Sequence, residues 1–262
     1  MAQTEFAQRG DVKLAYETVG RGEPPIVFVH GWSCDRSFFS PQVEHFASRH
    51  AVASIDLHGH GESSRPEPGA GRYSIDAFAD DVLAVAADAG FERPVVIGHS
   101  MGGVTALACA ARPGAVRAAV LVDPAPMVNA WVKEYLAGVV DNIETDTDGA
   151  YRTDFVGNMF LPTDTARRAE IIAGMSEMPC GPAAAAMRGI IDFDSAAALG
   201  NVEVPLLTIG SATASDQPAE LRGACPTITI GQTVGAGHFN QLEVPDQVNA
   251  MIERFFAVNG IR

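Results

Sequence analysis

Cysteine is scarce in this chain of 262 residues. The four cysteines lie far apart in sequence, none of them in a C-x-x-C pair, at positions 34, 109, 180 and 225. This spacing argues against a disulfide framework and against a structural zinc site. We therefore expect a chain that resides in a reducing cytoplasm.

Basic residues and long apolar runs are also lacking. Lys and Arg number 18 against 32 Asp and Glu, and the net charge of −14 disfavours nucleic acid and anionic membranes as partners. No stretch approaches about 18 apolar residues without a charge or proline, and residues 1–9 do not resemble a signal peptide. We expect a soluble, unexported protein with no membrane partner. The oligomeric state stays open, with a homo-oligomer as one alternative.

Short apolar runs alternate with segments of helical periodicity over most of the chain. A continuous apolar run of strand length is typical of a parallel strand that is buried on both faces. The six such runs are residues 25–29, 51–55, 94–97, 118–122, 205–209 and 227–230. Ser74 is the expected N-cap of a helix that packs on the sheet. The fold class is therefore α/β, with a mostly parallel sheet flanked by helices.

A nucleophile motif follows the third of these runs. The sequence Gly98-His-Ser100-Met-Gly102 lies between a predicted strand and an alanine-rich helix that extends to about residue 111. In this strand, turn and helix setting, G-x-S-x-G forms a strained elbow that presents the serine hydroxyl beyond the sheet. Ser100 is the candidate nucleophile. The backbone N–H of Met101 is one candidate oxyanion donor, and the N–H of Trp32 is the other, with Ser33 as its alternative.

A serine nucleophile needs a base, and His238 is the best candidate. It follows the last predicted strand and precedes a helix over residues 244–256, so it lies at the same sheet edge as Ser100. By alternation, His99 is expected to point away from Ser100. His58 and His60 form an H-x-H pattern in a glycine-rich loop without a third ligand cluster, and we therefore predict no metal.

The alternation of strands and helices is interrupted once, and we call residues 124–201 the insertion. It is predicted to be a helical cap on a core of residues 1–123 and 202–262. The expected helices cover residues 131–140, 151–160, 165–175, 182–191 and 195–199. Trp131, Phe155 and Phe160 of the insertion, together with Phe239, are the candidate substrate-binding residues. Aromatic residues at helical spacing are also typical of plain core, and this alternative stays open.

Taken together, these motifs resemble the α/β-hydrolase superfamily over nearly the whole chain. The matching segments, in the family's order, are His30-Gly31-Trp32, Asp56-x-x-Gly59-x-Gly61-x-Ser63, Gly98-x-Ser100-x-Gly102-Gly103, Asp123 and Gly237-His238. The resemblance implies the fold, a Ser-His nucleophilic pair and no cofactor. Two of the segments, around Trp32 and Ser100, are also similar to cofactor-free bacterial perhydrolases and arylesterases.

The acid that orients the histidine departs from the family's usual pattern. The usual position follows the strand after the insertion, but residues 210–215 carry no carboxylate and Asp216 comes late. A variant seen in zearalenone-type lactonases and some haloalkane dehalogenases places the acid one strand earlier, which matches Asp123. We favour Asp123 and keep Asp216 as the alternative. The structural alternatives are a turn before Pro124 for Asp123, and an N-cap of the helix containing Glu220 for Asp216.

The sequence therefore predicts a serine hydrolase, a carboxylesterase or lactonase, that acts on a small or medium apolar carboxylic ester or lactone through an acyl-enzyme. Serine at position 100 disfavours the epoxide hydrolases and dehalogenases of this family, which use aspartate there. Carbon–carbon bond hydrolases, cofactor-free perhydrolases and dioxygenases share the scaffold and stay as alternatives. A non-catalytic ligand receptor is the alternative from a different class.

Overall fold

The computed structural model describes residues 3–164 and 167–262. Within them the chain forms an eight-stranded sheet of order β1-β2-β4-β3-β5-β6-β7-β8. The strands are β1 (Thr4–Arg9), β2 (Val12–Val19), β3 (Ile26–Val29), β4 (Val52–Ile55), β5 (Val95–His99), β6 (Ala118–Val122), β7 (Leu206–Gly210) and β8 (Thr229–Gln232). Strands β3 to β8 pair in parallel, whereas β1 and β2 pair antiparallel to their neighbours. The predicted α/β class with a mostly parallel sheet is confirmed.

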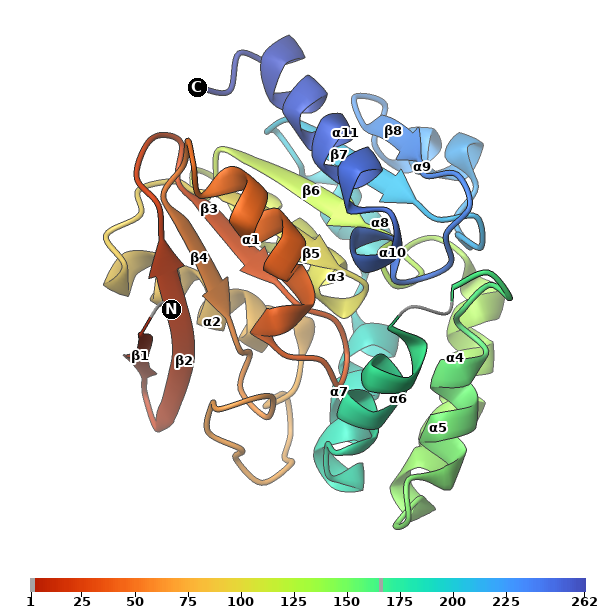
Figure 1. The fold of residues 1–262 in the computed structure, drawn as a ribbon. Coiled ribbons are helices and arrows are strands. Elements are labelled where there is room, and N and C mark those ends of the chain that lie inside the picture. The colour runs from red at the N-terminus through yellow and green to blue at the C-terminus, as the bar shows by residue number, and fades with distance from the viewer. Residues whose placement is uncertain (1–2, 165–166) are drawn as a thin grey trace.

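The sheet separates two hydrophobic cores. Along β3, Val27 and Val29 pack into one core, and Ile26 and Phe28 pack into the other, as the alternation of side chains in a strand requires. Helices α2 (Ile75–Asp88) and α3 (Met101–Ala110) cover one face, and α1 (Ser40–Phe46) and α11 (Pro245–Val258) cover the other (Figure 1). Burial on both faces explains why these strands read as continuous apolar runs.

All six strands predicted from apolar runs are present as β3 to β8, each within two residues of its predicted bounds. Ser74 also caps α2 as expected, because its hydroxyl accepts the N–H of Ala77 at 3.2 Å. The hairpin of β1 and β2 was not predicted. Its strands mix apolar with charged and polar residues, such as the exposed Lys13 between the buried Val12 and Leu14, and so neither strand is one continuous apolar run.

The insertion lies between β6 and β7 and is helical in the described residues. Its helices are α4 (Ala130–Thr145), α5 (Ala150–Gly157), α6 (Arg168–Ser176), α7 (Cys180–Asp192) and α8 (Ser195–Gly200). Helices α4 to α7 gather beyond the carboxyl ends of the central strands (Figure 1). Residues 165–166, the first two of one expected helix, lie outside the described residues.

Three short helices complete the described fold: the 3-10 helix η1 (Arg36–Phe39), α9 (Pro218–Ala224) and α10 (Asn240–Glu243). Over residues 3–164 and 167–262, no helix combines the length and apolar character needed to cross a bilayer. The sheet edge where β3, β5, β6 and β8 end is the part of the fold that carries the predicted site residues.

Candidate active site

Ser100 occupies a strained turn between β5 and α3. Its φ of 55° and ψ of −118° lie outside the regions that residues with a side chain normally adopt. The glycines on either side permit the turn because the backbones approach closely there. A methyl group on Gly98 would overlap the carbonyl oxygen of Gly102, and one on Gly102 would overlap the carbonyl oxygen of Val29. The half-buried serine therefore stands at the sheet edge, as the G-x-S-x-G pattern predicts.

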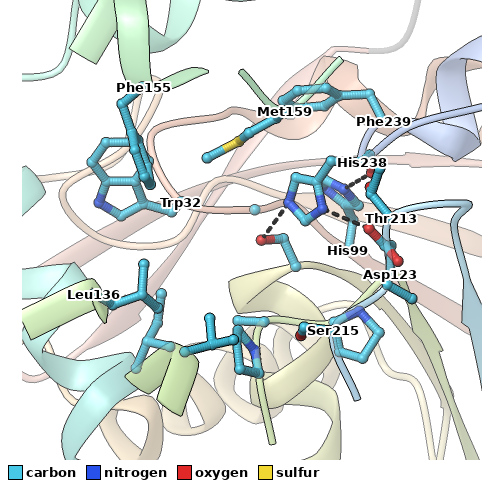
Figure 2. Close-up of a pocket in the computed structure, with 18 of the residues that line it drawn as sticks. Trp32, His99, Asp123, Leu136, Phe155, Met159, Thr213, Ser215, His238 and Phe239 are labelled. Atoms are coloured by element: carbon cyan, nitrogen blue, oxygen red, sulfur yellow. Dashed lines mark hydrogen bonds and ion pairs between the residues drawn. The ribbon is translucent and has the colours of Figure 1, made fainter. Parts of the chain in front are cut away.

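His238 connects Ser100 to Asp123. Its Nε2 atom lies 3.0 Å from the Ser100 hydroxyl oxygen, and its Nδ1 atom lies 2.7 Å from Asp123 Oδ2 (Figure 2). With a proton on Nδ1 donated to the carboxylate, Nε2 is free to accept the serine proton. The structure thus brings together the three residues that the sequence singled out as nucleophile, base and favoured acid.

The Asp123 carboxylate is held on both sides. Asp123 directly follows β6, has a φ of 36°, and donates its N–H to the Ile209 carbonyl at 2.8 Å. Its Oδ1 atom accepts the N–H of Ser211 at 2.7 Å, which leaves Oδ2 for His238. The loop after β7 therefore supplies a backbone donor to this site where the family usually has the carboxylate.

Asp216 has a different role. Its carboxylate accepts the N–H groups of Met127, Val128 and Asn129 at 2.8 to 3.1 Å, just before α4 begins. Burial raises the pKa of Asp216, although these three hydrogen bonds oppose the shift. Gln217, not Asp216, is the N-cap residue of α9, and so the expected N-cap role is wrong. Asp216 anchors the start of the insertion instead.

His99 lies against His238. The two rings are 4.7 Å apart between centroids, and the His99 Nε2 atom lies 2.8 Å from the main-chain oxygen of His238 (Figure 2). Burial, together with the nearby His238, holds the pKa of His99 well below its usual range, so this ring is neutral. The expectation that His99 points away from Ser100 did not include this contact with His238. Strand alternation gives no information on a loop 139 residues away.

The two candidate oxyanion donors belong to two segments that lie near Ser100. Met101 opens α3, so its N–H has no acceptor within the helix. The segment that contains Gly31 and Trp32 passes beside the nucleophile, because a methyl group on Gly31 would lie 3.2 Å from the Ser100 Cβ atom. Trp32 is fixed by its indole N–H, which donates to the Ala183 carbonyl of α7 at 2.7 Å. The alternative donor residue, Ser33, directs its hydroxyl to the sulfur of Met178 at 3.3 Å.

A cavity of about 270 Å³ opens next to Ser100 and His238. Figure 2 shows Trp32, Phe155 and Leu136 across the cavity from His238. Most of its wall is apolar, and the large apolar side chains are Trp32, Val132, Leu136, Phe155, Met159, Met175, Met187, Ile190 and Phe239. Within the described residues, no Lys or Arg lines it. Thr213 and Ser215, from the loop after β7, add hydroxyl groups that the sequence analysis did not single out.

Two of the four candidate substrate-binding residues do not line this cavity. Trp131 is 72% exposed and stacks on Tyr135 on the outer face of α4. Val132 and Leu136, each one residue later, face the cavity because one residue turns a helix by about 100°. Phe160 is buried behind the wall, where it stacks on Phe239 at 4.8 Å between ring centroids. The aromatic residues therefore belong to the insertion as expected, but Phe160 lies beyond the end of α5 at Gly157, and the pattern did not give the direction of each side chain.

The H-x-H histidines are engaged in the core of their loop. His58 contacts the carboxylate of Asp81 through Nδ1 and the Arg72 carbonyl through Nε2, the latter at 2.6 Å. His60 Nδ1 lies 3.0 Å from the His58 carbonyl oxygen. In the part of the chain that the structure describes, no three His, Cys, Asp or Glu side chains gather as a metal site would require.

Comparison with known proteins places this geometry in a family. The model of the alpha/beta hydrolase fold matches residues 24–245. A pimeloyl-(acyl-carrier protein) methyl ester esterase of Chromobacterium violaceum is 29% identical over 251 residues, which cover 90% of this chain and 88% of the relative. The AB hydrolase superfamily protein YisY of Bacillus subtilis is 38% identical over 102 residues, only 37% of its length.

Solved structures agree on the fold. The enol-lactonase from Burkholderia xenovorans LB400 superposes with a TM-score of 0.84 at 22% identity, covering 97% of this chain and 100% of the other. A thermophilic esterase from Thermogutta terrifontis superposes with a TM-score of 0.81 at 25% identity, covering 98% of each chain. The match of the family model to most of the sequence and the agreement of the folds lead to one conclusion: this chain belongs to the alpha/beta hydrolase family.

Proposed function

We propose that this protein is a serine hydrolase that cleaves a small or medium apolar carboxylic ester or lactone through an acyl-enzyme. One observation carries the proposal: the hydrogen-bonded series Ser100, His238, Asp123, with distances of 3.0 and 2.7 Å, stands at the wall of a largely apolar cavity. In this proposal Ser100 is the nucleophile, His238 the general base and acid, and Asp123 the orienting carboxylate.

Acylation follows from the contacts of His238. As the Ser100 oxygen adds to the ester carbonyl carbon, its proton passes to His238 Nε2, and the imidazolium is stabilised by the Asp123 carboxylate. The N–H groups of Met101 and Trp32 stabilise the negative charge on the carbonyl oxygen. The carbon–oxygen bond of the ester then breaks, and the leaving alkoxide takes the proton from His238. A lactone opens in the same step, with its hydroxyl end still attached to the acyl group.

Deacylation repeats the cycle with water. His238 removes a proton from a water molecule as it attacks the acyl carbonyl, and the bond to Ser100 breaks as the serine oxygen recovers that proton. The products are a carboxylic acid and an alcohol, or a hydroxy acid from a lactone.

The proposal includes the insertion as a cap over Ser100. Its helices supply Leu136, Phe155 and Met187 to the cavity wall, and this apolar lining favours an uncharged acyl or alcohol group. The Chromobacterium relative, which is similar over 90% of this chain, is named as a methyl ester esterase and supports the ester class.

A two-step experiment tests the proposal. A fluorophosphonate probe should label the protein, and mass spectrometry of the digest should locate the label on Ser100. The protein should also hydrolyse short p-nitrophenyl esters, and Ser100→Ala should lower kcat/KM by about 10³-fold or more. His238→Ala should act alike, and the double variant should be little worse than either, because the two residues act as a unit.

The outcomes separate the competing classes. Labelling of Ser100 without hydrolysis of any ester or lactone contradicts the proposal and favours another chemistry of this scaffold, whereas a protein that is not labelled favours the receptor. Hydrolysis that persists in Ser100→Ala at the wild-type rate contradicts the acyl-enzyme.

A further inference from the structure

The main chain around His238 is held from the insertion. The N–H of His238 donates to the Met159 carbonyl at 3.0 Å, and the N–H of Gly237 donates to Asp164 Oδ2 at 2.8 Å. The imidazole of His238, by contrast, is bonded to Ser100 and Asp123 on the sheet edge. The base therefore has its ring bound to the core and two consecutive amides bound to the insertion.

Asp164 is a buried residue that joins the insertion to the histidine loop. The residue is 2% exposed, and the same Oδ2 atom that accepts from Gly237 also accepts the N–H of Leu161 at 2.8 Å. One carboxylate oxygen thus ties the turn of residues 159–164 to the histidine loop. Burial, and then the charge of the nearby Asp164, raise the pKa of Glu243 in α10. A buried carboxylate is tolerated only where hydrogen bonds compensate it, and here two amides do so.

Gly237 shows how closely the two segments approach. A methyl group at this position would lie 2.7 Å from Asp164 Oδ2, 2.7 Å from the Met159 carbonyl oxygen and 3.0 Å from the Leu161 nitrogen. Two of these three atoms are backbone and cannot turn aside. Position 237 therefore requires glycine because of the close approach to the insertion.

We propose that Asp164 is a positioning residue for His238, through which the insertion holds the base in line with Ser100. The inference rests on the proposed function, because it assigns a purpose to the alignment of this base. The purely local alternative is that Asp164 only closes the turn at Leu161. Alignment matters because a base displaced by about 1 Å loses on the order of 10²-fold in rate.

Three variants test the proposal, with a p-nitrophenyl butyrate assay that measures kcat and KM separately. Asp164→Ala removes both hydrogen bonds and should lower kcat by at least about tenfold, with a smaller change in KM. Asp164→Asn keeps an oxygen that can accept both N–H groups and should stay within about threefold of wild type. Gly237→Ala should also lower kcat, because its methyl group would push the histidine loop away from Asp164 Oδ2 and the Met159 carbonyl. The double variant should lose less than the two single losses combined, because the two changes share the contact between Gly237 and Asp164.

Asp194→Ala is the matched control. Asp194 is an exposed aspartate of the insertion whose carboxylate accepts the Ala197 N–H at 2.9 Å at the start of α8. Its loss removes a comparable hydrogen bond away from the histidine loop and should leave kcat unchanged. Circular dichroism melting of each variant monitors folding, and Gly237→Ala carries the test if Asp164→Ala does not fold.

A wild-type kcat in folded Asp164→Ala overturns the proposal, and so does a wild-type kcat in Gly237→Ala if Asp164→Ala does not fold. An equal loss of kcat in Asp164→Ala and Asp194→Ala, in step with their melting temperatures, also overturns it, since the effect is then general destabilisation. The rate at which the fluorophosphonate labels Ser100 provides a readout that does not require ester turnover. If wild type is labelled but hydrolyses nothing, the proposed function fails, while slower labelling of Asp164→Ala still supports the positioning role.

Discussion

The Oδ2 atom of Asp123 lies 2.7 Å from Nδ1 of His238, although 115 residues separate the two in sequence. Asp123 directly follows β6 and His238 follows β8, with β7 between these strands. Parallel strands deliver their carboxyl ends to one sheet edge, which is where ligand sites of such sheets form. The insertion and β7 both intervene in sequence, but neither separates the two residues in space.

Amide substitutions should distinguish the two candidate acids. Asp123→Asn should lower kcat on the order of 10⁴-fold by analogy with serine proteases, because the amide favours the wrong tautomer of His238. Asp216→Asn should stay within about threefold of wild type, since the amide oxygen can replace Oδ1 as the acceptor for Val128 and Asn129, and only the hydrogen bond from Met127 to Oδ2 is lost. Steady-state ester hydrolysis measures both. Collapse in Asp216→Asn with normal turnover in Asp123→Asn would reverse the assignment.

Substrate charge should matter because no Lys or Arg among the described residues lines the cavity. The p-nitrophenyl ester of butyric acid should be preferred at least about tenfold in kcat/KM over the p-nitrophenyl monoester of succinic acid, whose free carboxylate would be buried without a partner. Comparison of the two substrates at one pH and ionic strength measures this ratio. A tenfold preference for the anionic ester would disprove the apolar cavity as the basis of specificity.

Glycine substitutions should have opposite effects on stability at two positions. Gly98→Ala places a methyl group against the Gly102 carbonyl and should destabilise the protein by about 3 kcal/mol, since backbone must move. Gly138→Ala, on the exposed side of α4 with open space around it, should stabilise by up to about 1 kcal/mol through helix propensity. Urea denaturation measures both. If Gly98→Ala stabilised the protein as Gly138→Ala is expected to do, the elbow would tolerate a side chain.

Acid should weaken the fold through buried histidines. Burial lowers the pKa of His30, His60 and His99, so the unfolded state binds protons below about pH 6.5 that the folded state does not. The free energy of unfolding should therefore fall as pH drops below about 6.5, by up to about 1.4 kcal/mol per pH unit for each histidine.

Urea midpoints at pH 7.5, 6.5 and 5.5 test this, and His60→Gln should lessen the loss. The raised pKa values of Asp216 and Glu243 act in the opposite direction, because as the pH falls each carboxyl group takes up its proton in the folded state before it does so in the unfolded state. A urea midpoint that stays constant from pH 7.5 to 5.5 would contradict the role of the buried histidines.

The sequence by itself determined the parallel strands, the elbow and the order of the site residues. The strands β3 to β8 can be predicted from the sequence because burial on both faces requires continuous apolar residues, as in Val95 to Ile97. The elbow around Ser100 is readable because its geometry excludes side chains at Gly98 and Gly102. These requirements are local, so each one restricts the residue types at particular positions, and the restriction is visible in the sequence.

Only the tertiary structure decided which side chains meet. Trp131 and Val132 are neighbours in sequence, yet one is in solvent and the other lines the cavity, because the rotation of α4 is set by what it packs against. Asp164 carries no motif, and its contact with Gly237 joins loops 73 residues apart. Such contacts depend on the relative placement of separate elements, and a pattern within one segment does not encode that placement.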